Sequence, residues 1–271
     1  MKIFNYISIA ITLLFFTSCE EVVNVDLNTA APRLVVEAAI NWQKETDGSV
    51  QKIKLSTTTD FYSNVIPKVT GADVSIKNEA NTTFVFTEIP NTGEYQCTNF
   101  VPVIGEEYTL TIIYQGTTYT ATETMQSVTP IDKIEQRNDA GFSGEDYEVK
   151  VFYTDPLEEN FYMVKFFPDI YKSPIYEVSG DEFSNGNQKS WTFPDEDLIQ
   201  GSVIAITHYG ISKNYYNYMS KIIPLSGSDG GPFQTTPATV RGNVVNQTNI
   251  DNYALGYFSL SEVDVATYTI L

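Results

Sequence analysis

The stretch "YTLTIIYQGTTYTATETM", residues 108–125, decides the fold class of this chain. In its first half, apolar residues such as Leu110 and Ile112 alternate with threonines. A period of two predicts a β-strand with one apolar and one polar face. Gln115 and Gly116 then separate this run from a second, similar one, which is typical of a hairpin turn. The stretch therefore predicts two antiparallel strands in a sheet with one buried face.

Five further segments before this hairpin are rich in Val, Ile, Thr, Tyr and Phe and are bounded by Gly, Asn or Pro. They are "RLVVEAAIN" (33–41), "VQKIKLSTTT" (50–59), "ADVSIKN" (72–78), "TFVFTEI" (83–89) and "GEYQCTNF" (93–100). With the hairpin they make seven strands in about one hundred residues, the number found in an immunoglobulin-like β-sandwich. We therefore predict such a domain over residues 30–127.

The second half, residues 128–271, is predicted to form another mainly β domain. Pro130 in "SVTPIDKI" interrupts the strand pattern, which places the boundary near Val128 and a new strand from Ile131. The segments "YEVKVFYTD", "NFYMVKFFPD" and "SVIAITHYG" indicate core strands, the first two paired through "PLEEN". The polar composition of residues 169–195 predicts a long loop. The fold class is thus mainly β, with two β-sandwich domains.

One short helix is predicted near residues 212–223. Ser212 can cap its start and Pro224 can end it. Its apolar stripe consists of Tyr215, Tyr218, Met219 and Ile222. The stripe is more typical of packing against a sheet, although the two tyrosines could also stack on a sugar.

The N-terminus resembles the signal peptide of a bacterial lipoprotein. Lys2 precedes an apolar run from Ile7 to Phe16, and Thr17-Ser18-Cys19 resembles a lipobox, in which lipid is attached to the cysteine. We expect residues 1–18 to be removed, Cys19 to carry the lipid and residues 19–29 to form a tether. The alternative is an ordinary secretory signal cut near Ser18.

Charge and cysteine content limit the possible partners. The chain has 34 acidic against 16 basic side chains, a net charge of −18, and no Lys/Arg cluster, which argues against nucleic-acid binding. The acidic balance is explained by solubility, with cation collection as the alternative. Once Cys19 is lipidated, Cys97 is the remaining cysteine, so no internal disulfide is expected. Its place in a strand predicts a buried thiol.

The sequence favours binding over catalysis. It contains one histidine, His208, and no G-x-S-x-G elbow or H-E-x-x-H motif accompanies it. A pair of carboxylates acting as a glycosidase is the catalytic alternative. The acidic segments 181–185 and 195–197 lack the spacing of a calcium loop, so we predict no metal site and no cofactor.

Several segments of the chain together carry a family resemblance: "CEEVVNVDLNTAAPRLVVEAAIN", "KLSTTTDFYS", "VTGADVSI", "IGEEYTLTI", "TYTATETM" and "GGPFQTTPATVRGNVVNQTNIDNYALGYFSLSEV". They resemble DUF4249, a family of Bacteroidota cell-envelope lipoproteins. The resemblance implies a protein encoded beside TonB-dependent outer-membrane receptors, and it carries over no catalytic residues. Glu20-Glu21 is also similar to the acidic signal that directs lipoproteins of this phylum to the cell surface.

The expected function is that of a lipid-anchored protein of the outer membrane, exposed at the cell surface, which captures a ligand or assists a TonB-dependent transporter. The alternative is a structural or adhesive spacer of the envelope. Ligand or partner contact is predicted in the segment 169–195, because long loops often carry function. The candidate contact residues there are Tyr171, Tyr176, Phe183 and Trp191. The alternative is that these aromatic side chains fold back onto the sheet.

Overall fold

A computed structural model describes residues 31–60, 63–141, 144–180, 186–226 and 240–271. Cys19, the predicted signal peptide and most of the predicted tether lie outside these residues. Contacts group Pro32–Leu271 into one compact unit. The described part is mainly β, as predicted, and includes one helix.

All seven strands predicted before Val128 are confirmed. They are β1 (Leu34–Gln43), β2 (Gln51–Thr57), β3 (Asp73–Asn78), β4 (Thr83–Ile89), β5 (Glu94–Cys97), β6 (Glu107–Tyr114) and β7 (Thr117–Thr124). Gln115 and Gly116 have φ angles of 49° and 75°, so the β6–β7 turn has two residues in the left-handed region, as a tight hairpin requires. The predicted hairpin is therefore present.

These strands enclose one core in a β-sandwich. The sheet runs in the order β1-β2-β5-β4-β3-β6-β7 and ends on the short β14 (Val245–Asn246). Its inward side chains, including those of Ile40, Leu55 and Leu110, are fully buried and belong to one cluster. The alternating apolar residues produce this burial because successive side chains of a strand point to opposite faces.

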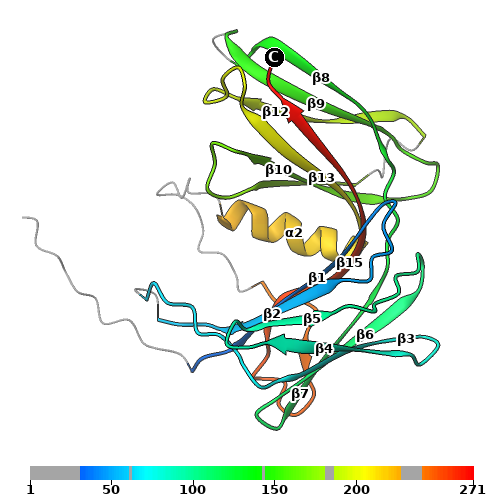
Figure 1. The fold of residues 1–271 in the computed structure, drawn as a ribbon, viewed down its shortest axis with the longest axis vertical. Coiled ribbons are helices and arrows are strands. Elements are labelled where there is room, and N and C mark those ends of the chain that lie inside the picture. Colours follow the sequence, from blue (N-terminus) through cyan, green and yellow to red (C-terminus); the bar gives the residue numbers. More distant parts are fainter. Residues whose placement is uncertain (1–30, 61–62, 142–143, 181–185, 227–239) are drawn as a thin grey trace, which may run out of the picture. The chain divides into compact units, whose positions relative to one another are not determined.

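The C-terminal strand β15 (Leu255–Thr269) extends through both halves of the chain (Figure 1). Its first part pairs in parallel with β1, and Phe258 and Leu260 contribute to the core of the seven strands. Its last part pairs antiparallel with β13 (Val203–Ile211). The sheet is therefore continuous across the predicted boundary at Val128, and independent folding of the two halves stays a prediction.

The second half packs two sheets face to face. β8 (Ile131–Ala140), β9 (Asp146–Thr154) and β12 (Gln188–Asp195) form a three-stranded sheet. It covers the part of the large sheet made by β10 (Phe161–Pro168), β11 (Ile175–Gly180), β13 and the end of β15. The predicted pairing of β9 with β10 is wrong, because these strands belong to different sheets. They meet through their buried faces instead, with the rings of Tyr153 and Tyr162 5.1 Å apart.

Much of the segment 169–195 is strand and not the long loop predicted from its polar composition. β11 and β12 occupy most of its described residues. In β12, Trp191 and Phe193 are buried and alternate with more exposed residues. This period of two was obscured by charged and polar neighbours, which occupy the outer face of the strand.

The helix α2 (Lys213–Ser226) begins as predicted but ends later. Ser212 caps it, because its Oγ accepts a 3.1 Å hydrogen bond from the backbone N–H of Tyr215. Pro224 lies inside the last turn, where the missing N–H removes one backbone hydrogen bond and the helix continues to its end. The helix packs against β10 and β11. Figure 1 shows α2 near β10.

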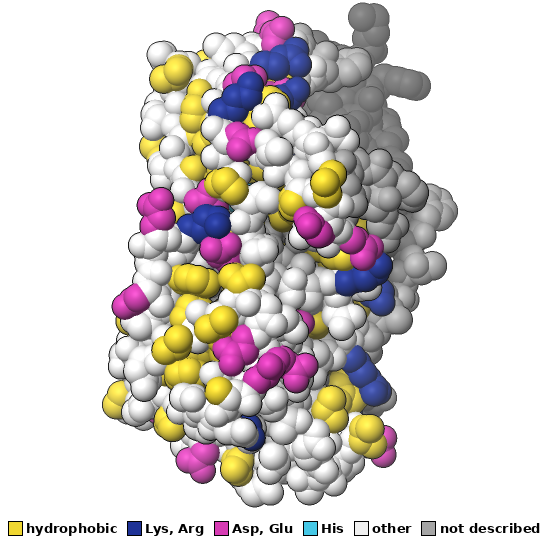
Figure 2. Space-filling model, turned by 90° about the vertical axis from the view of Figure 1, so that its right-hand side faces the viewer, with side chains coloured by type: hydrophobic (Ala, Val, Ile, Leu, Met, Phe, Trp, Pro, Cys, Tyr) yellow, Lys and Arg dark blue, Asp and Glu magenta, His cyan; other side chains and the backbone are white. Residues whose placement is uncertain are grey.

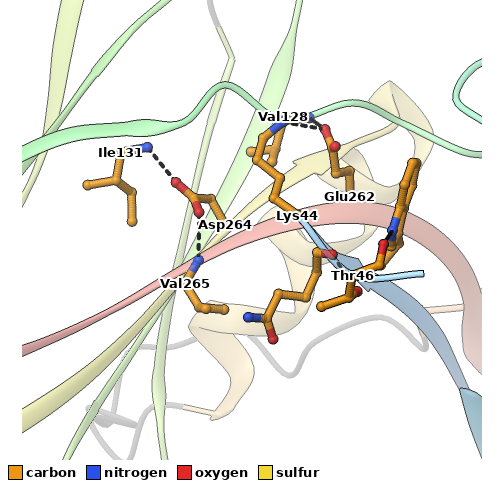
Figure 3. A network of polar contacts seen from close by, with 9 residues as sticks. Lys44, Thr46, Val128, Ile131, Glu262, Asp264 and Val265 are labelled. Atoms are coloured by element: carbon orange, nitrogen blue, oxygen red, sulfur yellow. Dashed lines mark hydrogen bonds and ion pairs between the residues drawn. The ribbon is translucent and has the colours of Figure 1, made fainter. Parts of the chain in front are cut away.

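Two acidic side chains of β15 bind the backbone where the chain passes from the first half to the second (Figure 3). Glu262 accepts a 3.0 Å hydrogen bond from the N–H of Val128 and lies 3.0 Å from the ammonium group of Lys44. Asp264 accepts a 2.7 Å hydrogen bond from the N–H of Ile131. These polar contacts therefore fix the segment that connects the two halves of the chain against β15.

Candidate functional site

A cavity of about 420 Å³ lies between α2 and the large sheet. Five tyrosines line it, and they come from β11, β13, α2 and β15. They are Tyr176, Tyr209, Tyr215, Tyr218 and Tyr257. Met163 and Met219 add flexible apolar surface that adapts to different shapes. The lining is therefore mainly aromatic and apolar, and its tyrosines and serines add hydroxyl groups.

Three of these tyrosines form a packed group. The ring of Tyr257 lies 4.8 Å from the rings of both Tyr215 and Tyr218, with an interplanar angle of 41° in each pair. Tyr215 and Tyr218 are three residues apart on α2 and therefore lie on the same face of the helix. Their rings are 6.2 Å apart and nearly parallel, at 15°. The group forms an ordered aromatic wall before any ligand enters.

Small side chains on β1 and β15 leave room for the cavity. Ser259 and Ser261 are buried and line it, while Phe258 and Leu260, which alternate with them along β15, point to the opposite face of the sheet. Ala39 lines the cavity from β1. Gly256 has a φ angle of 89°, and a Cβ at this position would lie 2.0 Å from the carbonyl oxygen of Val36. Glycine therefore permits the close approach of β15 to β1.

A half-buried carboxylate connects the cavity wall to the start of α2. Glu123, near the end of β7, accepts hydrogen bonds from the Ser212 hydroxyl at 2.9 Å and from the Tyr257 hydroxyl at 3.2 Å. Burial raises the pKa of Glu123 above its ordinary value. This residue thus holds Tyr257 and the first turn of α2 together.

The residues predicted to contact a ligand or partner are dispersed. Tyr176 lines the cavity. Tyr171 donates a hydrogen bond to Asp195, and this contact raises the pKa of Tyr171 to about 12. Trp191 is buried in the core between the two sheets, which agrees with the alternative that the aromatic side chains fold back onto the sheet. Phe183 and Cys19 lie outside the described residues. The contact role of this segment stays a prediction.

His208 points away from the cavity into the core of the second half. It is fully buried, with its ring 4.6 Å from that of Tyr153 and 5.1 Å from that of Tyr162. Burial lowers the pKa of His208 to about 3, which keeps the imidazole neutral. Within the described ranges, no three His, Cys, Asp or Glu side chains are grouped to hold a metal ion.

Charged side chains on the surface lie among uncharged ones. On the face shown in Figure 2, acidic and basic side chains occur side by side, with apolar groups between them. Among the described helices, none is both long and apolar enough to cross a membrane.

Two partial signals for the cavity are present in the sequence. The stripe on α2 includes Tyr215 and Tyr218, whose alternative role in sugar stacking placed them near a ligand. Tyr257, Ser259 and Ser261 share one face of β15 with a period of two, but the wall that they form depends on strands far apart in sequence. Tyr209 and Ala39 could therefore be assigned to the cavity lining only once the order of the strands in the sheet was known.

The fold and the cavity define a mainly β protein with a preformed aromatic cavity beside its single described helix. The chain belongs to the family described as "Domain of unknown function (DUF4249)", whose family model matches residues 20–267. This confirms the family resemblance in the sequence.

Comparison with solved structures finds distant likenesses. A two fibronectin type-III domain segment from chicken tenascin has 13% sequence identity and a TM-score of 0.22. The match covers 66% of this chain and 90% of the tenascin segment. A DUF4785 family protein from Legionella pneumophila has 9% sequence identity and a TM-score of 0.23. The match covers 65% of this chain and 52% of the Legionella protein. No curated protein matches the chain. Likenesses this distant carry no functional argument.

Proposed function

We propose that this chain is a non-catalytic binding protein that captures a small ligand in the cavity between α2 and the sheet. The observation that carries the proposal is the cavity of about 420 Å³ with five tyrosines in its lining. Ligand pockets have volumes of about 300–1,000 Å³ and combine apolar walls with a few polar groups. The size and chemistry of this cavity match that description.

The lining favours a ligand with a ring or another compact apolar body. Tyr215, Tyr218 and Tyr257 offer aromatic contact area, and the Tyr218 hydroxyl adds a hydrogen-bonding group. The hydroxyl groups of Ser259 and Ser261 add polar groups on the sheet side. The tyrosines and serines of the lining are thus placed to bind one small molecule together.

The proposal includes the cellular setting expected from the sequence. Lipid on Cys19 would anchor the protein at the outer membrane, and captured ligand would pass to a TonB-dependent transporter. The lipobox-like ending of the apolar N-terminal run supports the anchor. Replacing Cys19 with Ser should abolish lipid labelling and release the protein from membranes, and a retained lipid label on the Ser variant would contradict the anchor.

Ligand capture is tested with N-phenyl-1-naphthylamine, a neutral aromatic probe that fluoresces in apolar surroundings. We expect saturable binding at one site in the native protein. Ala39→Trp should fill the cavity and weaken binding at least about tenfold, a loss of about 1.4 kcal/mol. Ala205→Trp is the matched control, because Ala205 is exposed on the same sheet and does not line the cavity.

Two results would contradict the proposal. Equal probe binding by the Ala39→Trp and Ala205→Trp variants would place the probe elsewhere, and absence of saturable binding would remove the cavity as a capture site. For the transporter, the tagged protein is purified from outer membranes. Co-purification of a TonB-dependent receptor supports the partnership, and its repeated absence would favour a structural spacer.

A further inference from the structure

A second pocket of about 250 Å³ adjoins the tyrosine-lined cavity. Tyr218 and Tyr257 line both, so the two spaces lie against the same two aromatic side chains. The second pocket differs in chemistry, because its lining is polar and includes two cations. Its polar side chains are Asn214, Asn217, Lys221, Arg241 and Asn243.

The two cations come from different segments and meet at this pocket. Lys221 follows Tyr218 by three residues on α2, so both lie on one face of the helix. Arg241 places its guanidinium 3.8 Å from the ring centre of Tyr253. Among the residues that the structure describes, neither cation has an ion-pair partner within 4.0 Å.

The segment that carries Arg241 is fixed to β15. Asn243 donates a 2.8 Å hydrogen bond to the carbonyl oxygen of Phe258 and accepts one of 2.9 Å from its N–H. Gly242 approaches the backbone so closely that a Cβ would lie 1.6 Å from the carbonyl oxygen of Gly256. This part of the site is therefore pre-organised, which reduces the entropy lost on binding.

The tyrosine-lined cavity itself contains no basic side chain in its lining. Its charged lining residue is Glu37, whose carboxylate lies 3.0 Å from the ammonium group of Lys54. An anionic group would therefore not be matched inside the cavity but would be matched in the adjoining pocket. The two spaces divide the recognition of an amphipathic molecule between them.

We propose that the ligand is an amphipathic carboxylate, with its ring or other apolar body in the tyrosine-lined cavity and its carboxylate beside Lys221 and Arg241. This inference rests on the proposed ligand capture and names the class of ligand. Arginine suits a carboxylate because the planar guanidinium can donate two parallel hydrogen bonds. The net charge of −18 repels anions at long range, so a preference for an acid has to come from these local cations.

The test uses a matched pair of compounds, 3-phenylpropanoate and its neutral amide, 3-phenylpropanamide. Each is titrated against the protein carrying bound N-phenyl-1-naphthylamine, and displacement is measured at about 20 mM and 150 mM salt. We expect the acid to displace the probe at least fivefold more effectively than the amide at the lower salt. The preference should shrink at 150 mM salt, where the Debye length is about 8 Å.

The Lys221→Ala/Arg241→Ala double variant should lose the preference for the acid while it binds the neutral probe as the native protein does. Lys213→Ala is the control, since Lys213 lies on the same helix, does not line either pocket and is 3.0 Å from Glu159. It should retain the preference. Unchanged binding of the neutral probe shows that the double variant keeps its cavity.

Three outcomes would overturn the inference, and they separate it from the proposed function. If the probe binds but the acid and amide displace it equally, ligand capture stands and the anionic class is wrong. If the Lys213 variant loses the preference as fully as the double variant, general surface charge is responsible. If the probe does not bind the native protein, both the proposed function and the ligand class fail.

Discussion

The hydroxyl group of Ser212 donates a 2.9 Å hydrogen bond to the carboxylate of Glu123, which lies 89 residues earlier in the chain. The same hydroxyl accepts the N–H of Tyr215, and the same carboxylate accepts the hydroxyl of Tyr257. This chain of contacts joins β7, the start of α2 and β15. It therefore supports the wall of the cavity from three elements.

Glu123 should give the stability of the protein a specific pH dependence. Because burial raises its pKa in the folded state, the folded state binds a proton at pH values where the unfolded state has lost it. Its contribution is fully present below the ordinary pKa of about 4.5 and is lost as pH rises through the raised value. Lowering the pH from 7 to 5 should therefore stabilise the native protein relative to Glu123→Gln.

The measurement is urea unfolding of both proteins at pH 5, 6 and 7. Gln keeps an oxygen that can accept the bonds from Ser212 and Tyr257 but cannot ionise. A difference in unfolding free energy that stays constant across this range would show that Glu123 does not titrate there. A difference that changes in the opposite direction would show that the folded state lowers its pKa.

Ser212→Ala should destabilise the protein by about 1 kcal/mol, because the cap of α2 is lost and Glu123 loses a donor. Ser220→Ala is the control on the same helix, since the Ser220 hydroxyl bonds the carbonyl oxygen of Tyr216 on an exposed surface. We expect it to change stability by less than about 0.5 kcal/mol. Thermal unfolding measures both, and equal effects of the two substitutions would argue against a capping role.

Cys97 should react slowly with thiol reagents in the native state. Its side chain is buried in the core of the seven strands, and its Sγ lies 3.1 Å from Oδ1 of Asn99. Labelling therefore requires local opening, and we expect a rate at least about 100-fold below that of the unfolded protein. The control Cys97→Ser/Thr98→Cys moves the thiol to the exposed neighbouring position and should react at once. Rapid labelling of the native protein would place Cys97 on an accessible surface.

Strands were predicted from sequence more reliably than their partners. The period of two around Leu110 and Ile112 specifies a strand locally, and the turn at Gln115-Gly116 fixes a neighbour, because both signals lie within a few residues. The pairing of β9 with β10 was wrong because each strand bonds more distant partners. Sequence proximity favours a hairpin, but burial of two apolar faces is also satisfied by placing the strands in facing sheets.

The cavity was only partly visible in the sequence for a related reason. Tyr215 and Tyr218 were identified as a stripe, but a stripe that fills a core and a stripe that lines a cavity have the same spacing. What distinguishes them here is the small size of Ser259 and Ser261 on the opposing strand. That strand is brought opposite the helix by the order of the sheet, which the local pattern does not encode.

Phe258→Ala should test how strongly the two halves of the chain depend on each other. Phe258 is fully buried in the core of the seven strands, although it belongs to β15, which continues into the second half. Removing its ring should cost about 3–5 kcal/mol through lost burial and the cavity that remains. Val265→Ala on the same strand, at a side chain that is 42% exposed, should cost less than about 1 kcal/mol.

The two tryptophans of the chain, Trp42 and Trp191, report on the two halves separately. Phe258→Ala is combined with Trp42→Phe or Trp191→Phe, so that the fluorescence of one remaining tryptophan follows unfolding in urea. Each is compared with the same tryptophan variant that retains Phe258. Because β15 pairs with β1 and with β13, we expect Phe258→Ala to shift both signals to lower urea together. A shift of the Trp42 signal alone would show that residues 30–127 unfold independently, as the division predicted at Val128 requires.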